Sequence, residues 1–459
     1  MPSTSSHNAK SLFFQHLLLP TGWARDVRLR LAAGRISAVE TGADAVADDE
    51  RHRCGLPGMP NLHSHAFQRG MAGLAERRGP SSDSFWTWRE IMYRFVDRMT
   101  PDDVQAIAAL AYLEMLEGGF TRVGEFHYLH HDRAGAVFAD VAEMSGAIVA
   151  AAAQSGIGLT LLPVLYSYAG FGAKPAQPAQ ARFLFDIEGY ARLIEGAKRH
   201  AGTLPDAVVG VAPHSLRAVS PEQLQALATM SKGCPVHIHI AEQVKEVEDC
   251  VAWSGQRPVE WLLDHADVDD RWCLIHAIHM TEAETRRLAH SGAVAGLCPI
   301  TEANLGDGLF PVEAFLDAGG RYGVGSDSNV RIDCSEELRL LEYGQRLTRR
   351  ARNVLARGAD RSTGADLHAA ALAGGAAALG AQGGIVVGAA VDIVSLDLDH
   401  PALLHREGDA ITDSFVFAAG RSAIDCVWRY GDKLVSNGRH RARARIVQNY
   451  RSALERLIR

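Results

Sequence analysis

Residues 207–241 read AVVGVAPHSLRAVSPEQLQALATMSKGCPVHIHIA, and this stretch decides the fold. Two apolar, β-branched runs, 207–213 and 235–241, flank a polar segment with helical spacing. Ser220 is placed to cap that helix, and Pro221 is placed to begin it. A strand, a helix and a second strand in this order predict two parallel strands joined by a crossover helix.

The same alternation continues on both sides of this unit. Residues 281–292 (TEAETRRLAHSG) predict another helix, which opens on a threonine cap and ends at Gly292. Further apolar runs occupy residues 160–165, 272–278, 293–299 and 322–327. Near-continuous apolar strands are typical of a parallel sheet covered by helices. Six or more such units favour a closed (β/α)8 barrel over an open sheet, with functional residues at the carboxyl ends of the strands.

Both ends of the chain have a different pattern. Residues 10–58 contain short runs such as DVRLRLAAGRISAVE, in which VRLRL alternates with the period of a half-buried strand and Ala-Gly supplies a turn. Residues 385–397 and 423–440 repeat this pattern. We therefore expect a small β-sandwich domain from residues 1–58 and 385–440, a distorted barrel from 59–384, and a C-terminal helix at 441–459.

Residues 365–384 (ADLHAAALAGGAAALGAQGG) are rich in alanine and glycine. A low-complexity segment would have this composition, but the periodic leucines favour a tightly packed helix of small residues.

The overall composition indicates a soluble enzyme. The chain has 459 residues, of which 47% are hydrophobic and 22% charged, and a net charge of −7. The negative charge argues against a protein that binds nucleic acid or an anionic membrane. The first ten residues lack a signal-peptide core, and no run approaches the roughly 18 apolar residues of a membrane span. Seven scattered cysteines without a CxxC pair indicate reduced thiols, so we expect a cytoplasmic location.

Metal-ligand side chains stand where several of the expected strands end. His63 and His65 follow LPGMPNL, His239 follows PVHI, and Asp327 follows YGVGS. Residues i and i+2 of a strand face the same side, so His63 and His65 can reach one ion. His237 shares a face with His239, and we take His239 as the ligand because it lies nearer the strand end. Imidazole and carboxylate ligands favour zinc or a similar ion with one position left for water.

Two acid–base residues accompany these ligands. His276 closes WCLI, and Glu242 follows His239 by three residues. Each residue alone has an ordinary explanation: an HxH pair is usually structural, and Asp327 in GSDS could cap a helix. Four separate strands that each end in a fitting residue favour a metal centre.

Four motifs carry a family resemblance. GMPNLHSH, HIHIAE, LIHAIH and GVGSDSN resemble the motifs of the amidohydrolase superfamily, in the same order and across nearly the whole chain. The resemblance implies a distorted TIM barrel in which His63, His65, His239 and Asp327 hold the metal, with His276 as a catalytic residue that is not a ligand. Two-metal members carry a carboxylated lysine after the fourth strand. Here the corresponding TLLPVLYSYAG has no lysine, which favours one ion, zinc or alternatively iron or another divalent metal.

A narrower resemblance concerns the substrate. HSHAFQRGMAGLAERRG and SFWTWREIMYRF are similar to the formimidoylglutamate deiminases of histidine degradation, which hydrolyse N-formimino-L-glutamate to N-formyl-L-glutamate and ammonia and are commonly homodimers. This substrate carries two carboxylates, which arginine binds bidentately. Arg89 and Arg217 are the candidates for that contact, and Gln68, Tyr128 and His214 are expected to add hydrogen bonds.

The resemblance also implies roles in the reaction. We expect Asp327 to take a proton from the attacking water, His276 to orient that water or to stabilise the developing charge, and Glu242 to protonate the departing nitrogen. The main alternative is another deaminase or chlorohydrolase of the superfamily, acting on guanine, a triazine or an adenosine-like compound. A neutral aromatic substrate has no need of two arginines, so the SFWTWR segment discriminates against it. An inactive scaffold would lack several ligands, and a simple binding module would release no ammonia.

Overall fold

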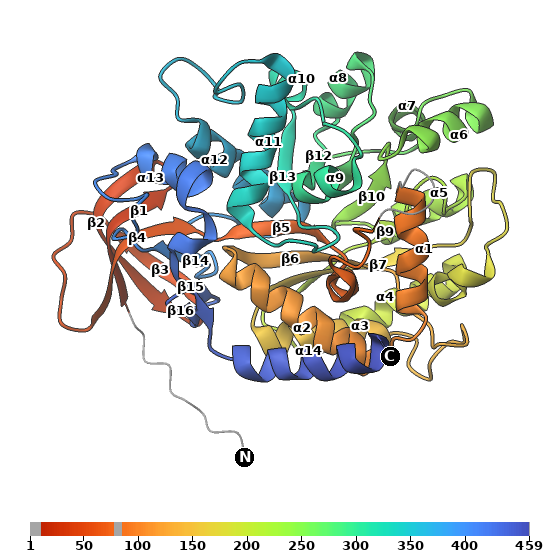
Figure 1. The fold of residues 1–459 in the computed structure, drawn as a ribbon, viewed down its shortest axis with the longest axis horizontal. Coiled ribbons are helices and arrows are strands. Elements are labelled where there is room, and N and C mark those ends of the chain that lie inside the picture. The colour runs from red at the N-terminus through yellow and green to blue at the C-terminus, as the bar shows by residue number, and fades with distance from the viewer. Residues whose placement is uncertain (1–10, 78–84, 459) are drawn as a thin grey trace.

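The computed structural model describes residues 11–77 and 85–458 (Figure 1). Its centre is a ring of parallel strands in two arcs. One arc contains β5 (Met59–Ser64), β6 (Phe120–His127), β7 (Gly158–Leu165), β8 (Val208–Val209) and β9 (Ala212–Pro213). The other contains β10 (Val236–Ile240), β11 (Trp272–His276), β12 (Val294–Leu297) and β13 (Arg321–Val324).

Isolated bridges join the two arcs at both seams. Ser64 pairs with Asp327 at one seam, and Ser215 pairs with His239 at the other, both in the parallel sense. The strands therefore follow the order of a (β/α)8 barrel, although the ladders are not continuous around the ring. The expectation of a distorted barrel is confirmed.

Helices follow the strands and surround the ring (Figure 1). They begin where the sequence supplies caps: Ser220 and Thr281 each accept a hydrogen bond from the backbone three residues on, and Gly292 ends its helix at a φ of 80°. These helices are α2 (Pro101–Glu117), α3 (Glu143–Ser155), α4 (Ile187–Ala201), α5 (Pro221–Met230), α6 (Val244–Ser254), α7 (Pro258–His265), α8 (Glu282–Ser291), α9 (Pro299–Leu305), α10 (Val312–Asp317), α11 (Cys334–Arg349) and α12 (Thr363–Ala378). A short helix, α13 (Asp409–Ser414), packs on α12.

The two ends of the chain form one eight-stranded sheet beside the barrel. Its order is β17-β16-β15-β14-β4-β1-β2-β3, and only β1 and β4 pair in parallel. The strands are β1 (Ser11–Leu19), β2 (Gly22–Ala32), β3 (Arg35–Glu40), β4 (Asp49–Pro57), β14 (Ile393–Leu396), β15 (Ile424–Arg429), β16 (Asp432–Ser436) and β17 (Arg439–His440). The two ends meet where β4 lies against β14, and hydrogen bonds connect all eight strands in one continuous sheet.

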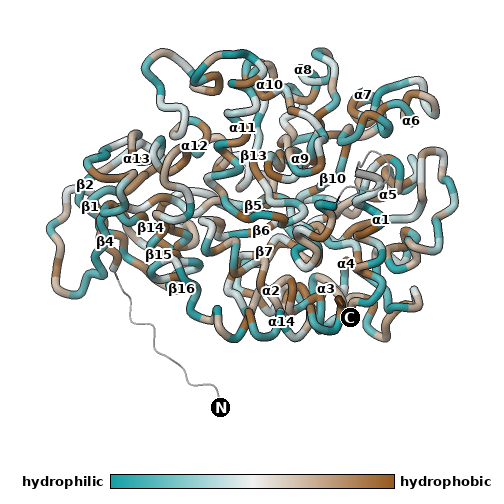
Figure 2. The backbone as a smooth tube through the Cα atoms, in the orientation of Figure 1, coloured by the Kyte–Doolittle hydropathy of each residue, from teal (hydrophilic) through white to brown (hydrophobic). Residues whose placement is uncertain are grey.

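The C-terminal helix α14 (Arg443–Ile458) lies against α2 at the surface (Figure 1). Hydrophobic and hydrophilic residues are mixed along it (Figure 2), and two of its arginines pair with α2: Arg443 with Glu117, and Arg456 with Asp103. The basic C-terminal segment is thus a surface helix with acidic partners. Within the described residues, no helix is both long enough and apolar enough to cross a membrane.

Residues 365–378 of the alanine- and glycine-rich segment lie in helix α12, as the leucine spacing predicts, whereas residues 379–384 follow the helix. The helix packs on β5, β12 and β13. Small residues are required there because the helix backbone touches the strands. A β-carbon added at Gly374 would lie 1.9 Å from the carbonyl oxygen of Tyr322, and one added at Gly375 would lie 3.1 Å from Pro60. The helix therefore sits closer to the barrel than any larger side chain would allow.

We expect Gly374→Ala to destabilise the protein by about 3 kcal/mol or more, since overpacking against a backbone atom cannot be relieved by a rotamer change. The exposed neighbour Ala373 provides the control, because Ala373→Gly costs only helix propensity, about 1 kcal/mol. Thermal and denaturant unfolding measure both. Equal stability of the two variants would contradict the close packing of α12.

Candidate active site

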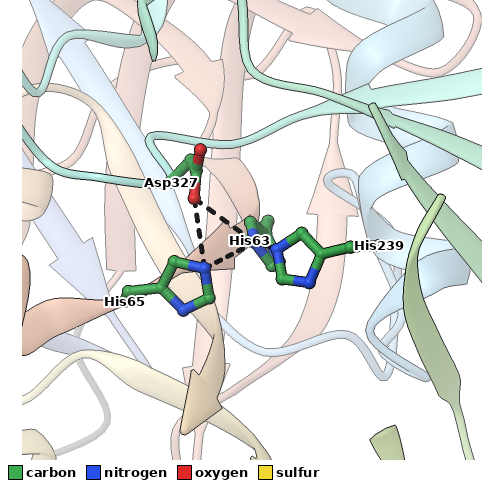
Figure 3. Close-up of side chains that lie close together, drawn as sticks. All are labelled: His63, His65, His239 and Asp327. Atoms are coloured by element: carbon green, nitrogen blue, oxygen red, sulfur yellow. Dashed lines mark hydrogen bonds and ion pairs between the residues drawn. The ribbon is translucent and has the colours of Figure 1, made fainter. Parts of the chain in front are cut away.

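Four side chains converge at the carboxyl ends of the barrel strands: His63 at the end of β5, His65 directly after it, His239 from β10, and Asp327 after β13 (Figure 3). The Nε2 atom of His63 lies 3.2 Å from Nε2 of His65 and 3.0 Å from Nε2 of His239. The Oδ1 atom of Asp327 lies 3.4 Å from Nε2 of His63 and 3.2 Å from Nε2 of His65. All four residues are buried.

This cluster fits one divalent ion. Four ligands at about 2.0–2.1 Å from a tetrahedral ion lie roughly 3.3 Å from one another, which is close to the observed separations. Burial lowers the pKa of His63, His65 and His239, so their imidazoles are neutral at neutral pH and offer lone pairs to a cation. The donor set and its spacing therefore suit a metal ion of the zinc type.

Hydrogen bonds fix which ring nitrogen faces the cluster. The Nδ1–H of His65 donates to the carbonyl oxygen of Phe126 at 2.9 Å, and the Nδ1–H of His239 donates to that of His214 at 3.2 Å. Each bond leaves the Nε2 lone pair pointing toward the other ligands. Such second contacts orient metal-binding histidines and increase their basicity.

A polar network joins β5 to the loop after β13. The side-chain amide of Asn329 donates to the carbonyl oxygens of His65 and Asp327 at 3.2 and 3.0 Å, while its oxygen accepts from Ser326. Ser326 in turn is bonded to Asn61 on β5. Asp327 has a φ of 45°, a strained conformation for a residue with a side chain. The network holds the carboxylate against the histidine pair across the barrel seam. Asn329 ends the GVGSDSN motif, but sequence reasoning assigned it no role.

The acid–base candidates lie beside Asp327. The Nε2 atom of His276 is 3.8 Å from Oδ2 of Asp327 and 3.9 Å from Oε1 of Glu242. Its Nδ1–H donates to Oε1 of Glu302 at 3.2 Å. Burial alone would lower the pKa of His276, but the carboxylates of Glu242, Glu302 and Asp327 outweigh it and raise that pKa to about 10. Burial raises the pKa of Glu242 to about 8, against the opposing charge of His276.

Glu302 was not predicted from the sequence. It stands in the first turn of α9, directly after β12, and also accepts a hydrogen bond from the backbone N–H of Cys298. The sequence feature that could have identified Glu302 is its position shortly after an apolar run, in CPITEANLG. By holding Nδ1 of His276, Glu302 directs the Nε2 atom of that ring toward Glu242 and Asp327.

One pocket contains every substrate-binding residue predicted from the sequence. Gln68 on the 3₁₀ helix η1 (Ala66–Met71), Arg89 on α1 (Phe85–Val96), Tyr128, His214 and Arg217 line it together with His65, His239, Glu242, His276 and Asp327. The side-chain amide of Gln68 donates to the hydroxyl of Tyr128 at 2.9 Å. His63 is fully buried and is not part of the pocket lining. The wall also includes residues that the sequence did not indicate: Trp88, Met92, Tyr93, Tyr166, Phe183 and Leu305.

A parallel barrel that gathers three neutral imidazoles, a carboxylate and two further acid–base groups at its carboxyl end defines the class of metal-dependent hydrolases. Comparison with known protein families gives the same class. The sequence profile described as the amidohydrolase family matches residues 55–434, and that of the N-terminal domain of formimidoylglutamate deiminase HutF matches residues 12–53.

Relatives extend the match to the whole chain. A curated formimidoylglutamate deiminase of Pseudomonas aeruginosa is 50% identical over 98% of this chain and 99% of its own length. The crystal structure of an amidohydrolase from Brucella melitensis has a TM-score of 0.95 at 54% identity, covering 98% of this chain and 100% of that one. An adenosine deaminase from Xanthomonas campestris, crystallised with bound zinc, shares the fold with a TM-score of 0.80 at 24% identity and covers 98% of each chain. The chain therefore belongs to the metal-dependent amidohydrolase family and, within it, to the formimidoylglutamate deiminases.

Proposed function

We propose that this protein hydrolyses N-formimino-L-glutamate to N-formyl-L-glutamate and ammonia, as a step of histidine degradation, with one zinc ion held by His63, His65, His239 and Asp327. The observation that carries the proposal is that one pocket is lined both by three members of the metal-ligand cluster and by two arginines, Arg89 and Arg217. The 50% identity to a curated formimidoylglutamate deiminase supports the same substrate.

The two arginines suit a dicarboxylate. Arg217 is buried, and its pKa is raised because the surrounding acidic and phenolic groups outweigh its burial, so it keeps a full positive charge. A carboxylate accepts hydrogen bonds only, and a guanidinium offers two parallel N–H donors to it. Gln68, Tyr128 and His214 add neutral hydrogen-bonding groups to the same wall. The polar walls thus hold the glutamate moiety, and the formimino carbon lies toward the metal ligands.

The acid–base residues of the site transfer protons or orient the groups that do so. A divalent ion at this site supplies a Lewis acid that lowers the pKa of a water molecule toward neutrality. Asp327 accepts the proton of the attacking water, and His276, whose Nε2 atom is 3.8 Å from Oδ2 of Asp327, keeps that water oriented. Glu242 faces the same ring at 3.9 Å and delivers a proton to the departing nitrogen, which leaves as ammonia. Glu302 holds His276 in the orientation that these transfers need.

An ammonia-release assay tests this function on N-formimino-L-glutamate, N-formimino-L-aspartate and guanine. We expect N-formimino-L-glutamate to be hydrolysed most efficiently. Arg89→Ala is expected to lower kcat/KM on it by about 10- to 100-fold, because a hydrogen bond to a charged group is worth roughly 1.5–3 kcal/mol. The control is Arg94→Ala on the same helix, whose side chain is exposed. A preference for guanine, or equal kcat/KM in both variants, would contradict the dicarboxylate substrate.

A further inference from the structure

The wall of the pocket contains a tyrosine to which neither the sequence nor the known reaction assigns a role. Tyr166 directly follows β7, is 6% exposed and lines the pocket. Its ring packs against that of His214, with the ring centroids 4.7 Å apart and the planes at 68°. The positive charges of Arg217 and Arg89 both act on its hydroxyl. Tyr166 therefore stands among the residues that surround the substrate.

A glutamine determines the direction in which this hydroxyl can donate. Gln180 lies on the 3₁₀ helix η2 (Pro178–Phe183), and its Oε1 atom accepts the backbone N–H of Gln177 at 2.8 Å. This bond settles the orientation of the amide, because an NH₂ group in the same place could not accept. The Nε2 atom of Gln180 therefore donates to the Tyr166 hydroxyl oxygen at 2.7 Å.

The hydroxyl proton of Tyr166 is consequently available to a ligand. The oxygen already accepts a hydrogen bond from Gln180. The hydroxyl donates no hydrogen bond to any other residue within 11–77 and 85–458. Both neighbouring arginines are donors only and cannot take the proton. Burial raises the pKa of Tyr166 to about 12, so the hydroxyl stays protonated at neutral pH. It presents one O–H donor to the pocket beside two guanidinium groups.

We propose that Tyr166 binds the substrate by donating its hydroxyl proton to one of the two carboxylates, and that Gln180 is a positioning residue that directs this donation. The inference rests on the proposed function, because it names a residue that binds a carboxylate of the proposed substrate in the same pocket. The NH₂ group of a carboxamide can only donate hydrogen bonds. At this position it would face three other donors, the Tyr166 hydroxyl and the two guanidinium groups, and could pair with none of them. Tyr166 thus contributes to selection of a dicarboxylate over its amide.

The pair formed by Gln68 and Tyr128 repeats the arrangement on the same pocket. There too a side-chain amide donates to a tyrosine oxygen, at 2.9 Å, and the tyrosine hydroxyl donates to the sulfur of Met92 at 4.0 Å, a weak acceptor. Two arginines and two such tyrosines match a ligand with two carboxylates.

Tyr166→Phe tests the contact, because it removes the donor and keeps the ring. We expect KM for N-formimino-L-glutamate to rise about 10- to 100-fold, the effect of losing a hydrogen bond to a charged group, while kcat changes little. Two further substrates locate the contact: N-formimino-4-aminobutyrate lacks the α-carboxylate, and N-formimino-L-glutamine carries an amide in place of the γ-carboxylate. The effect of the substitution should disappear on one of them and persist on the other.

The control is Tyr168→Phe, two residues along the chain and outside the pocket lining, for which KM should equal that of the unchanged protein. An unchanged KM in Tyr166→Phe, or an equal rise on both analogues, would overturn the inference. Failure of the unchanged protein to release ammonia from N-formimino-L-glutamate would instead overturn the proposed function, so the two failures are distinguishable.

A double-mutant cycle tests Gln180. Gln180→Leu should raise KM by roughly 2- to 10-fold, since it removes a neutral hydrogen bond, and should have no further effect on KM in the Tyr166→Phe background. A merely structural role would lower the melting temperature equally in both backgrounds and leave KM unchanged in both. That result would overturn the role assigned to Gln180.

Discussion

Replacement of the metal-binding histidine on β10 is expected to abolish turnover. We expect His239→Ala to lower kcat about 10³-fold or more, because a catalytic metal contributes several kcal/mol and each 1.36 kcal/mol changes a rate tenfold. The same variant should hold far less than one ion per chain after dialysis, measured by elemental analysis. Its melting temperature should no longer rise on addition of zinc, because a ligand stabilises a protein only by binding its folded state.

The same strand offers a matched control. His237 lies two residues before His239 and is also buried, but its Nε2–H donates to the carbonyl oxygen of Ala378 at 2.8 Å. His237→Gln keeps a donor for that bond, so we expect one ion per chain and nearly normal turnover. Loss of the ion in His237→Gln, with retention in His239→Ala, would reverse the choice of ligand on this strand.

The second large effect is expected at Glu242. Glu242→Gln preserves the size of the side chain but cannot transfer a proton, so kcat should fall about 10²- to 10⁴-fold, the usual contribution of general acid–base catalysis. The metal content should stay at one ion per chain, because Glu242 is outside the cluster of His63, His65, His239 and Asp327. Ammonia release under single-turnover conditions, together with elemental analysis, separates loss of the proton donor from loss of the ion.

Glu248→Gln on α6 is the control for this substitution, since it makes the same chemical change at an exposed side chain outside the pocket. It should leave kcat unchanged. Near-normal kcat in Glu242→Gln would exclude Glu242 as the proton donor, and loss of the metal would indicate that its role is structural.

Local patterns in the sequence predicted much of the architecture. Apolar runs became strands because a strand of the barrel is covered on both faces, and helix caps such as Ser220 and Thr281 stand where the caps were expected. The leucine spacing identified α12 as a helix. The domain boundaries and the catalytic roles of the site residues stay predictions, whereas the placement of the predicted ligands in one cluster is observed.

The residues that sequence reasoning missed share one property: their function depends on a neighbour far away in the chain. Glu302 acts on His276, and Asn329 acts on His65, across separate strands of the barrel. An isolated glutamate or asparagine after an apolar run has no periodic or spacing signal. Its partner becomes known only when the barrel brings the strand ends together.

The pair formed by His63 and His65 shows most clearly which features follow from the sequence and which require the tertiary structure. The sequence by itself determined that His63 and His65 face one side of a strand, because side chains alternate along an extended backbone. It also determined that ligand-type residues end the other strands. The sequence favoured His239 over His237, and only the tertiary structure brought Nε2 of His239 to 3.0 Å from Nε2 of His63. Only the tertiary structure, too, placed Tyr166 in the pocket with Gln180 bonded to its hydroxyl. Strand periodicity is a local property of the backbone, whereas these contacts depend on the curvature and closure of the whole ring.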